Sequence, residues 1–156
     1  MRVSLIAIGR RMPDWVAAGV DEYSRRFSRD ICFELRALHV PASPSESAAI
    51  VQLREGEALR AAIPDGARVI ALDERGRSLT SAGWAERLGR DRDEGIDWAL
   101  LVGGADGHDE ATRARADWCW SLSMLTLPHM LVRVVVAEQV YRAVSILQGH
   151  PYHREG

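Results

Sequence analysis

The sequence reads WALLVGGADG over residues 98–107 and, after a polar stretch, LSMLTLPHMLVR over residues 122–133. The first segment is a short apolar run that ends at two glycines, which indicates a buried strand leading into a turn where backbone can approach a ligand. The second segment is an apolar loop with two hydroxyl side chains, and its Pro128 suits the first turn of a helix. Two such turns, close together in the sequence, predict a small-molecule pocket.

The composition is typical of one globular domain spanning residues 1–156, with 47% hydrophobic and 27% charged residues. A chain of this length buries about two-thirds of its unfolded surface. No apolar stretch approaches the roughly 18 residues of a membrane helix, and the N-terminus has no small-residue cleavage site, so we expect a cytoplasmic protein. The two cysteines, Cys32 and Cys119, are expected to be buried free thiols, and no residues have the spacing of metal ligands.

The formal net charge of −2 argues against indiscriminate nucleic-acid binding, which depends on a basic surface. All 20 basic residues are arginine, and both ends of the chain are mildly basic around an acidic middle. Residues 25, 26 and 29 are arginines that join Arg10 and Arg11 in the N-terminal region. This group is either a solvated helix end or a patch that faces phosphates.

Strands and helices alternate along the chain. The predicted strands are residues 3–9, 31–40, 68–72, 98–102 and 118–123, and the predicted helices are residues 13–27, 45–62, 80–90, 109–115 and 128–148. This alternation predicts an α/β fold with a mostly parallel sheet and helices on both faces. A charged, glycine-containing loop at residues 73–77 follows the third strand, where open α/β sheets bind ligands. The helix at residues 45–62 looks like the least constrained part of the chain.

The last helix and the tail carry two further signals. The first half of the helix is apolar almost all the way round, which predicts a subunit interface because every side of such a helix must be covered. Glu138 and Arg142 have ion-pair spacing on its polar side. The tail, residues 149–156, contains two histidines, a tyrosine and an arginine. It is either a disordered end or a segment that stacks on bases and binds phosphates.

Together these motifs closely resemble one family, the small SPOUT-class methyltransferases that modify N3 of a pseudouridine in large-subunit (23S) ribosomal RNA. The resemblance spans the chain and rests on LDERG at 72–76, LVGGADG at 101–107, the loop at 122–129, LVR at 131–133, Glu138-Gln139, YRA at 141–143 and HPYHR at 150–154. It implies a C-terminal deep trefoil knot, which general topology rules would exclude. It also implies a homodimer formed through the C-terminal helix.

The resemblance implies S-adenosylmethionine as the cofactor, bound in the knot. The residues carried over as its contacts are Leu72, Gly103, Leu122, Ser123, Met124, Leu125, Thr126 and Leu127, with Gly104 extending the same turn. Backbone in tight apolar loops can hold adenine and ribose, so no phosphate-binding loop is needed. Three departures from the family pattern are Met124 in place of Lys, Leu127 in place of Phe, and Ala105-Asp106 in place of Pro-Glu. If that Lys contacts RNA, either the affinity for RNA is lower here or another arginine compensates.

The acceptor nitrogen carries a proton, so we expect a general base. His129 has a suitable unperturbed pKa and lies beside the loop, although it is equally compatible with a packing or capping role. In this family the tail of one protomer is thought to complete the site of the other. Tyr152 is therefore expected to stack on the target base, and His153 and Arg154 to orient the base or its phosphates. Arg133, Glu138 and Arg142 are expected to be structural.

Three other interpretations fit less well. Another knotted methyltransferase, acting on a transfer RNA or an unmodified uridine, would not explain the tail. A ribosome-binding module that has lost catalysis would not need the intact cofactor loops. A flavodoxin-like nucleotide-binding domain would need a glycine loop after the first strand. Because the net charge is low, we expect the assembled ribosome, rather than naked RNA, to be the substrate.

Overall fold

A computed structural model describes the backbone of residues 1–28 and 30–154 and the side chains of residues 1–28 and 30–152. Its strands are β1 (Arg2–Ile8), β2 (Cys32–Leu38), β3 (Arg68–Ser78), β4 (Trp98–Val102) and β5 (Trp118–Ser121). Its helices are α1 (Asp14–Ser24), α2 (Ala48–Ala61), α3 (Ser81–Asp93), α4 (Glu110–Arg115), α5 (His129–Leu147) and a 3₁₀ helix, η1 (Pro151–Arg154). The predicted alternation of strands and helices is confirmed.

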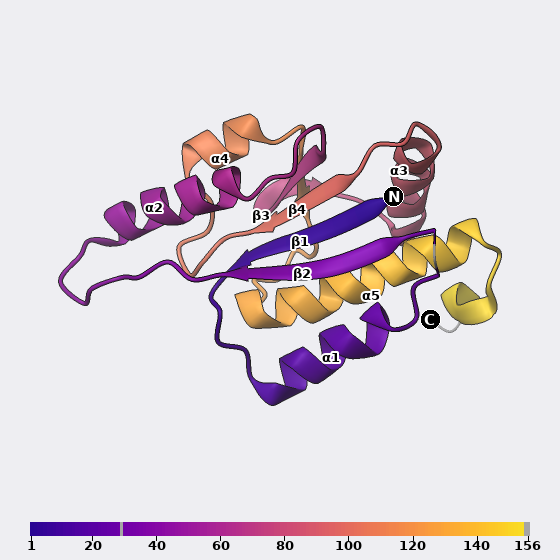
Figure 1. Cartoon of the computed structure of the whole chain (residues 1–156), viewed down its shortest axis with the longest axis horizontal. Helices are drawn as coiled ribbons and strands as arrows, with labels where there is room; N and C mark the ends of the chain where they lie inside the picture. The colour runs from indigo at the N-terminus through magenta and orange to yellow at the C-terminus, as the bar shows by residue number, and fades with distance from the viewer. Residues whose placement is uncertain (29, 155–156) are drawn as a thin grey trace.

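The five strands form one parallel sheet in the order β2-β1-β4-β3-β5. Figure 1 shows α2 and α4 on one face of this sheet and α1 and α5 on the other, with the chain's C-terminal end beyond α5. A parallel sheet covered on both faces needs strands that are apolar throughout, and β4 is buried at every position. The predicted α/β class, with helices on both faces of a parallel sheet, is therefore confirmed.

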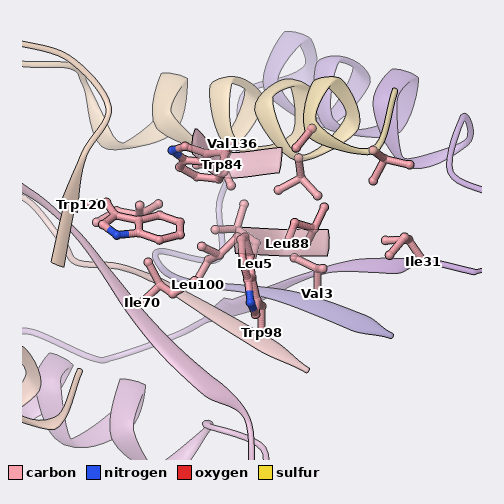
Figure 2. Close-up of a cluster of buried hydrophobic side chains, with 14 of the residues drawn as sticks. Val3, Leu5, Ile31, Ile70, Trp84, Leu88, Trp98, Leu100, Trp120 and Val136 are labelled. Carbon is pink, nitrogen blue, oxygen red and sulfur yellow. The ribbon is translucent and has the colours of Figure 1, made fainter. Parts of the chain in front are cut away.

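The larger core lies between the sheet and helices α3 and α5. Figure 2 shows Trp84 and Val136 from the helices above Leu5, Leu100 and Trp98 of the sheet. A smaller core between the sheet and α2 contains Ile6, Ile8, Leu59, Ala67, Val69, Ala99 and Leu101. The two cores pack a helical layer against each face of the sheet, so only its edges and the ends of its strands are left for a binding site.

Within the larger core, Trp98 supplies a polar contact as well as apolar area. Its indole Nε1 donates a hydrogen bond to Asp91 Oδ2 (2.7 Å), and the same buried carboxylate forms an ion pair with Arg68 (3.1 Å between Arg68 Nη2 and Asp91 Oδ1). The buried charge is therefore paired and hydrogen-bonded, as a buried carboxylate must be.

Strand β3 is longer than predicted because it continues through the charged loop. Leu72 is paired with Trp120, the register then shifts, and Arg77 is paired with the same Trp120. A Cβ at Gly76 would lie 2.5 Å from the carbonyl carbon of Trp120, so this close passage of two backbones requires glycine. The prediction relied on apolar periodicity and missed this pairing because residues 73–77 are mostly charged.

Both cysteines are free, but the expectation that they are buried was wrong: Cys32 is exposed and Cys119 is half-buried. In the part of the chain that the structure describes, no helix is long and apolar enough to cross a membrane. Over the same residues no cluster of three or more His, Cys, Asp or Glu side chains is arranged to hold a metal ion.

Candidate functional site

A cavity of about 280 Å³ lies at the carboxyl end of β4 and beside the second half of β3. Three segments form its walls: residues 72–75 within the long strand β3, residues 102–108 at and after the end of β4, and the loop between β5 and α5. Ligands of open α/β sheets bind outside the carboxyl ends of the strands, so this is where a site is expected. The pocket predicted from the two backbone-rich turns is therefore present, and both turns belong to it.

Most of the residues predicted to bind the cofactor line this cavity. The lining ones are Leu72, Gly103, Gly104, Leu122, Ser123, Leu125, Thr126 and Leu127. Met124 is the exception: its side chain is 100% exposed, and it is absent from the cavity wall. Cofactor binding by these residues stays a prediction. The positions of the lining residues support it, whereas the position of the Met124 side chain does not.

The turn after β4 depends on its glycines. A Cβ at Gly103 would lie 2.7 Å from the carbonyl carbon of Gly107 and 2.8 Å from its oxygen. Gly107 itself has a φ of +72°, and its N–H donates to the Gly104 carbonyl (3.2 Å). The turn thus folds back on itself so closely that its wall of the cavity consists largely of backbone.

The loop between β5 and α5 is held by its own hydroxyl groups. Ser121 Oγ donates to the Ser123 carbonyl (2.8 Å), and the Leu125 N–H donates to Ser123 Oγ (2.9 Å). Short polar side chains that bond nearby backbone favour such turns over regular structure. The loop therefore has a defined shape, although Met124 and Leu125 are exposed at its outer side.

His129 begins α5 and lines the cavity. Burial lowers the pKa of its imidazole, and the positive charge of Arg133 lowers it further. The ring is therefore neutral at neutral pH and can accept a proton. Arg133 is fully buried and donates from Nη2 to the carbonyls of Ile8 (2.6 Å) and Gly9 (2.7 Å), a tie between α5 and the end of β1 that fits the structural role expected for it.

His108 is a residue of this site that sequence reasoning missed. Its Nε2 lies 3.1 Å from the Leu72 carbonyl oxygen and 3.2 Å from that of Leu101. Because both partners are acceptors, Nε2 carries the proton, and the ring ties the end of β3 to the end of β4. Burial lowers the pKa of His108, so the ring stays neutral. Its position directly after the glycine turn was the sole available signal.

Arg113 and Asp73 complete the polar side of the cavity. Arg113 Nη1 donates to the His108 carbonyl and lies 3.6 Å from Asp73 Oδ2, and both residues line the cavity with His108. The Asp73 carboxylate is thus held by a cation on α4 at the end of β3. Asp73 and Arg113 thus place one ion pair in a cavity wall that otherwise consists mainly of apolar side chains and backbone atoms.

Figure 1 shows the tail segment η1 beside the C-terminal end of α5, and none of the described tail residues 149–152 lines the cavity. Tyr152 packs edge-on against Tyr141 (4.8 Å between ring centroids), and its hydroxyl lies 3.2 Å from Glu138 Oε1. Arg142 pairs with Glu138 (2.8 Å), which confirms the predicted ion pair, and its guanidinium lies over the Tyr152 ring. Burial and hydrogen bonds with Tyr23 and Glu138 raise the pKa of Tyr152 well above its usual range.

Within one chain the predicted catalytic residues are therefore not brought together. His129 begins α5 and lines the cavity, whereas the Tyr152 hydroxyl bonds Glu138, nine residues further along the helix, or about 14 Å at 1.5 Å per residue. The side chains of His153 and Arg154 lie outside the described residues. The residues predicted to bind the cofactor, other than Met124, line one cavity of this chain, and Tyr152 of the tail does not line it.

The chain matches the family model described as "Predicted SPOUT methyltransferase" over residues 1–153. It therefore belongs to the SPOUT methyltransferase family, as the resemblance of its sequence motifs led us to expect. Curated relatives named "Ribosomal RNA large subunit methyltransferase H" cover 99% of this chain and 100% of their own length. Those from Polynucleobacter asymbioticus, Thioalkalivibrio sulfidiphilus and Hahella chejuensis are 44%, 49% and 47% identical to it.

A solved methylase family protein from Neisseria gonorrhoeae has a similar fold, with a TM-score of 0.54. It is 12% identical in sequence, and the match covers 89% of this chain and 81% of that chain. At this identity the likeness concerns the fold alone.

Proposed function

We propose that this chain is an S-adenosylmethionine-dependent methyltransferase that methylates N3 of a pseudouridine in large-subunit ribosomal RNA. The observation that carries the proposal is the cavity whose three walls are Leu72, the Gly103–Gly104 turn and the loop at residues 122–127. It lies in a chain of the SPOUT methyltransferase family whose relatives, 44–49% identical over their full length, carry the name of a large-subunit rRNA methyltransferase.

The residues of the cavity fit the proposed cofactor. Apolar side chains of Leu72, Leu122 and Leu125 suit the faces of an adenine ring, and the hydroxyls of Ser123 and Thr126 suit a ribose. Because a Cβ at Gly103 would collide with Gly107, glycine lets this turn close on itself, and the turn presents backbone atoms at the cavity wall. The nearby carboxylate of Asp73 suits a cationic ligand better than a phosphate.

His129 is the proposed general base. When bound, the cofactor supplies a methyl group on a sulfonium, a reaction that an enzyme accelerates mainly by positioning. N3 of the base must lose its proton as the bond to the methyl carbon forms, and the neutral imidazole of His129 at the cavity wall accepts that proton. Arg133, one helical turn further along α5, keeps His129 neutral through its charge.

The proposal includes a trefoil knot at the C-terminal part of the chain and a homodimer formed through α5. In support of the knot, the backbone of Gly76 passes directly against Trp120, so the segments before and after β5 are closely interleaved with the end of β3. In support of the dimer, Leu131 and Val135 of α5 are left half-buried although α1, α3 and the sheet cover other sides of the helix.

The dimer also gives the tail a role. Tyr152 does not line the cavity of its own chain, because its side chain is held against Glu138 and Tyr141 of α5. We infer that the tail of one protomer completes the site of its partner, with Tyr152 stacking on the target base and His153 and Arg154 orienting the base or its phosphates. Because the net charge is −2, we infer that the assembled ribosome, in the cytoplasm, provides much of the binding surface.

The test is transfer of labelled methyl from S-adenosylmethionine to ribosomes from cells that lack this gene, with wild type and Arg154→Ala. We expect label at the pseudouridine of the large-subunit RNA, and loss of that label in the variant. Label in the variant equal to wild type would refute the role of the tail. Cofactor binding without any label would favour another RNA substrate, and no cofactor binding would favour a ribosome-binding module. Efficient methylation of an isolated stem-loop would refute the requirement for an assembled ribosome.

A further inference from the structure

Helix α2 lies directly against the glycine turn of the cavity, although its sequence looked least constrained. The Gln52 side chain donates from Nε2 to the carbonyls of Asp106 (2.7 Å) and His108 (3.3 Å). The Glu55 carboxylate lies against the backbone of Gly104, whose N–H lowers the pKa of this carboxyl. The expectation of weak constraint was therefore wrong, because this helix is attached to the turn by polar contacts that leave no apolar periodicity in the sequence.

Helix α2 and the segment of residues 104–109 pack closely together at two glycines, Gly56 and Gly104. A Cβ at Gly104 would lie 2.6 Å from Glu55 Oε1. A Cβ at Gly56 would lie 2.6 Å from Asp109 Oδ2, and the Asp109 carboxylate receives Arg60 of the same helix (2.8 Å). Each segment thus has a glycine where the other places a carboxylate. This reciprocal fit fixes how far α2 stands from the turn.

The residues that make these contacts form one line along α2. Gln52, Gly56 and Arg60 are spaced four residues apart, which places them on the same side of the helix, and Glu55, three residues after Gln52, lies next to them. Arg60 also donates to Thr112 Oγ1 (2.6 Å), so the line continues onto α4. The helix therefore bonds the segment from Gly104 to Thr112 from behind, while the opposite side of the turn forms the cavity wall.

We propose that Glu55 and Gln52 are positioning residues that hold the Gly103–His108 turn in the shape that binds S-adenosylmethionine. Neither residue lines the cavity, so they act through the backbone of Gly104, Asp106 and His108. The assignment of the ligand rests on the proposed function. The assignment of the contacts does not, because it depends on the hydrogen bonds alone.

The charge of Glu55 is not what the contact needs. Burial raises the pKa of Glu55 and the Asp106 carboxylate across the gap raises it further, while the hydrogen bond from Gly104 opposes both. A neutral side chain of the same shape still offers an acceptor oxygen to Gly104. Glu55→Gln therefore keeps the contact and removes the repulsion from Asp106, whereas Glu55→Ala removes the contact.

The test compares Glu55→Ala, Glu55→Gln and Gln52→Ala with Glu57→Ala, a matched control on the exposed side of the same helix. Two measurements are made on the full chain: hydrogen exchange of the amides of residues 103–108 without cofactor, and the dissociation constant for S-adenosylmethionine by calorimetry. We expect Glu55→Ala and Gln52→Ala to exchange faster at these amides and to bind about tenfold more weakly, which corresponds to one lost hydrogen bond. Glu55→Gln and Glu57→Ala should match wild type in both measurements.

A steady-state assay separates positioning from chemistry: the KM for the cofactor should rise in Glu55→Ala while kcat at saturating cofactor is retained. Wild-type exchange and affinity in both Glu55→Ala and Gln52→Ala would overturn the proposal, as would faster exchange with unchanged affinity. If Glu55→Ala fails to fold, Gln52→Ala decides the matter, because it removes a half-buried side chain at the edge of the contact. If wild type binds no cofactor, the proposed function fails, and the exchange data still test the contacts.

Discussion

Gly103→Ala should damage the cavity more than any other single-methyl change at the glycine turn. The added Cβ would lie 2.7 Å from the carbonyl carbon of Gly107 and 2.8 Å from its oxygen, and both of these are backbone atoms. Carbon atoms in good contact are about 3.5–4.0 Å apart, so the overlap is roughly 1 Å. Backbone cannot rotate away as a side chain can. The Gly104–Gly107 bridge must therefore open.

The cost is that of overpacking with little room for relaxation, about 2 kcal/mol of unfolding free energy. For a chain of this size that lowers the melting temperature by roughly 4–8 °C. Because the same turn forms one wall of the cavity, we expect the affinity for S-adenosylmethionine to fall by about a hundredfold, which equals about 2.8 kcal/mol.

The assay pairs thermal unfolding with calorimetry on Gly103→Ala and on Gly83→Ala. A Cβ at Gly83, near the start of α3, would meet its nearest atom at 3.5 Å, an ordinary contact. Alanine is a better helix former than glycine, so the control should match wild type or gain up to about 1 kcal/mol. Wild-type stability and affinity in Gly103→Ala would refute the claim that the turn is closed against Gly107.

Three further results are expected. His129→Ala should lower kcat by about a hundredfold with unchanged cofactor affinity, and wild-type activity should rise with pH through a pKa below the ordinary 6.5 of histidine, a limb that the variant lacks. Met124→Ala should leave the calorimetric cofactor affinity unchanged, because this side chain is fully exposed outside the cavity; a clear loss would contradict the lining. For Asp109, burial raises the pKa but hydrogen bonds from Thr112 and Arg60 lower it overall. The folded-state pKa lies below the unfolded one, so stability present above about pH 4 should be lost as pH falls; urea unfolding from pH 6 to pH 3 should show a smaller loss in Asp109→Asn.

The regular elements were predictable because apolar periodicity determines them. Every strand was found, and Thr80 and Asp109, at which two of the predicted helices begin, accept hydrogen bonds from the N–H groups of Gly83 (3.1 Å) and Thr112 (2.9 Å). The extension of β3 was missed because residues 73–77 are charged and the pairing depends on a register shift. Local patterns predict local structure, whereas this pairing is decided by how closely Trp120 approaches Gly76.

The site divides in the same way. Glycines and hydroxyls in a tight loop are visible in a sequence, so the walls at Gly103 and Ser123 were predicted. His108 and Gln52, which support the cavity walls, were not predicted. Both side chains bond backbone carbonyls, and because every residue has a carbonyl, no particular residue type in the sequence indicates the partner. The roles of the tail residues came from the resemblance, because the composition of the tail left both a disordered end and a base-stacking segment open.

The two halves of the proposed site have different requirements. All three walls of the cavity come from one chain and are held by contacts within it, including the tie from Arg133 to Gly9. Tyr152 is bound to Glu138 and packs against Tyr141, both of α5, and it does not line the cavity. We therefore expect cofactor binding to require only a folded protomer, and any step in which the tail contacts the base to require a second chain. On this reasoning, the contacts of Tyr152 with α5 keep the tail out of its own cavity, and methyl transfer, but not cofactor binding, should depend on assembly.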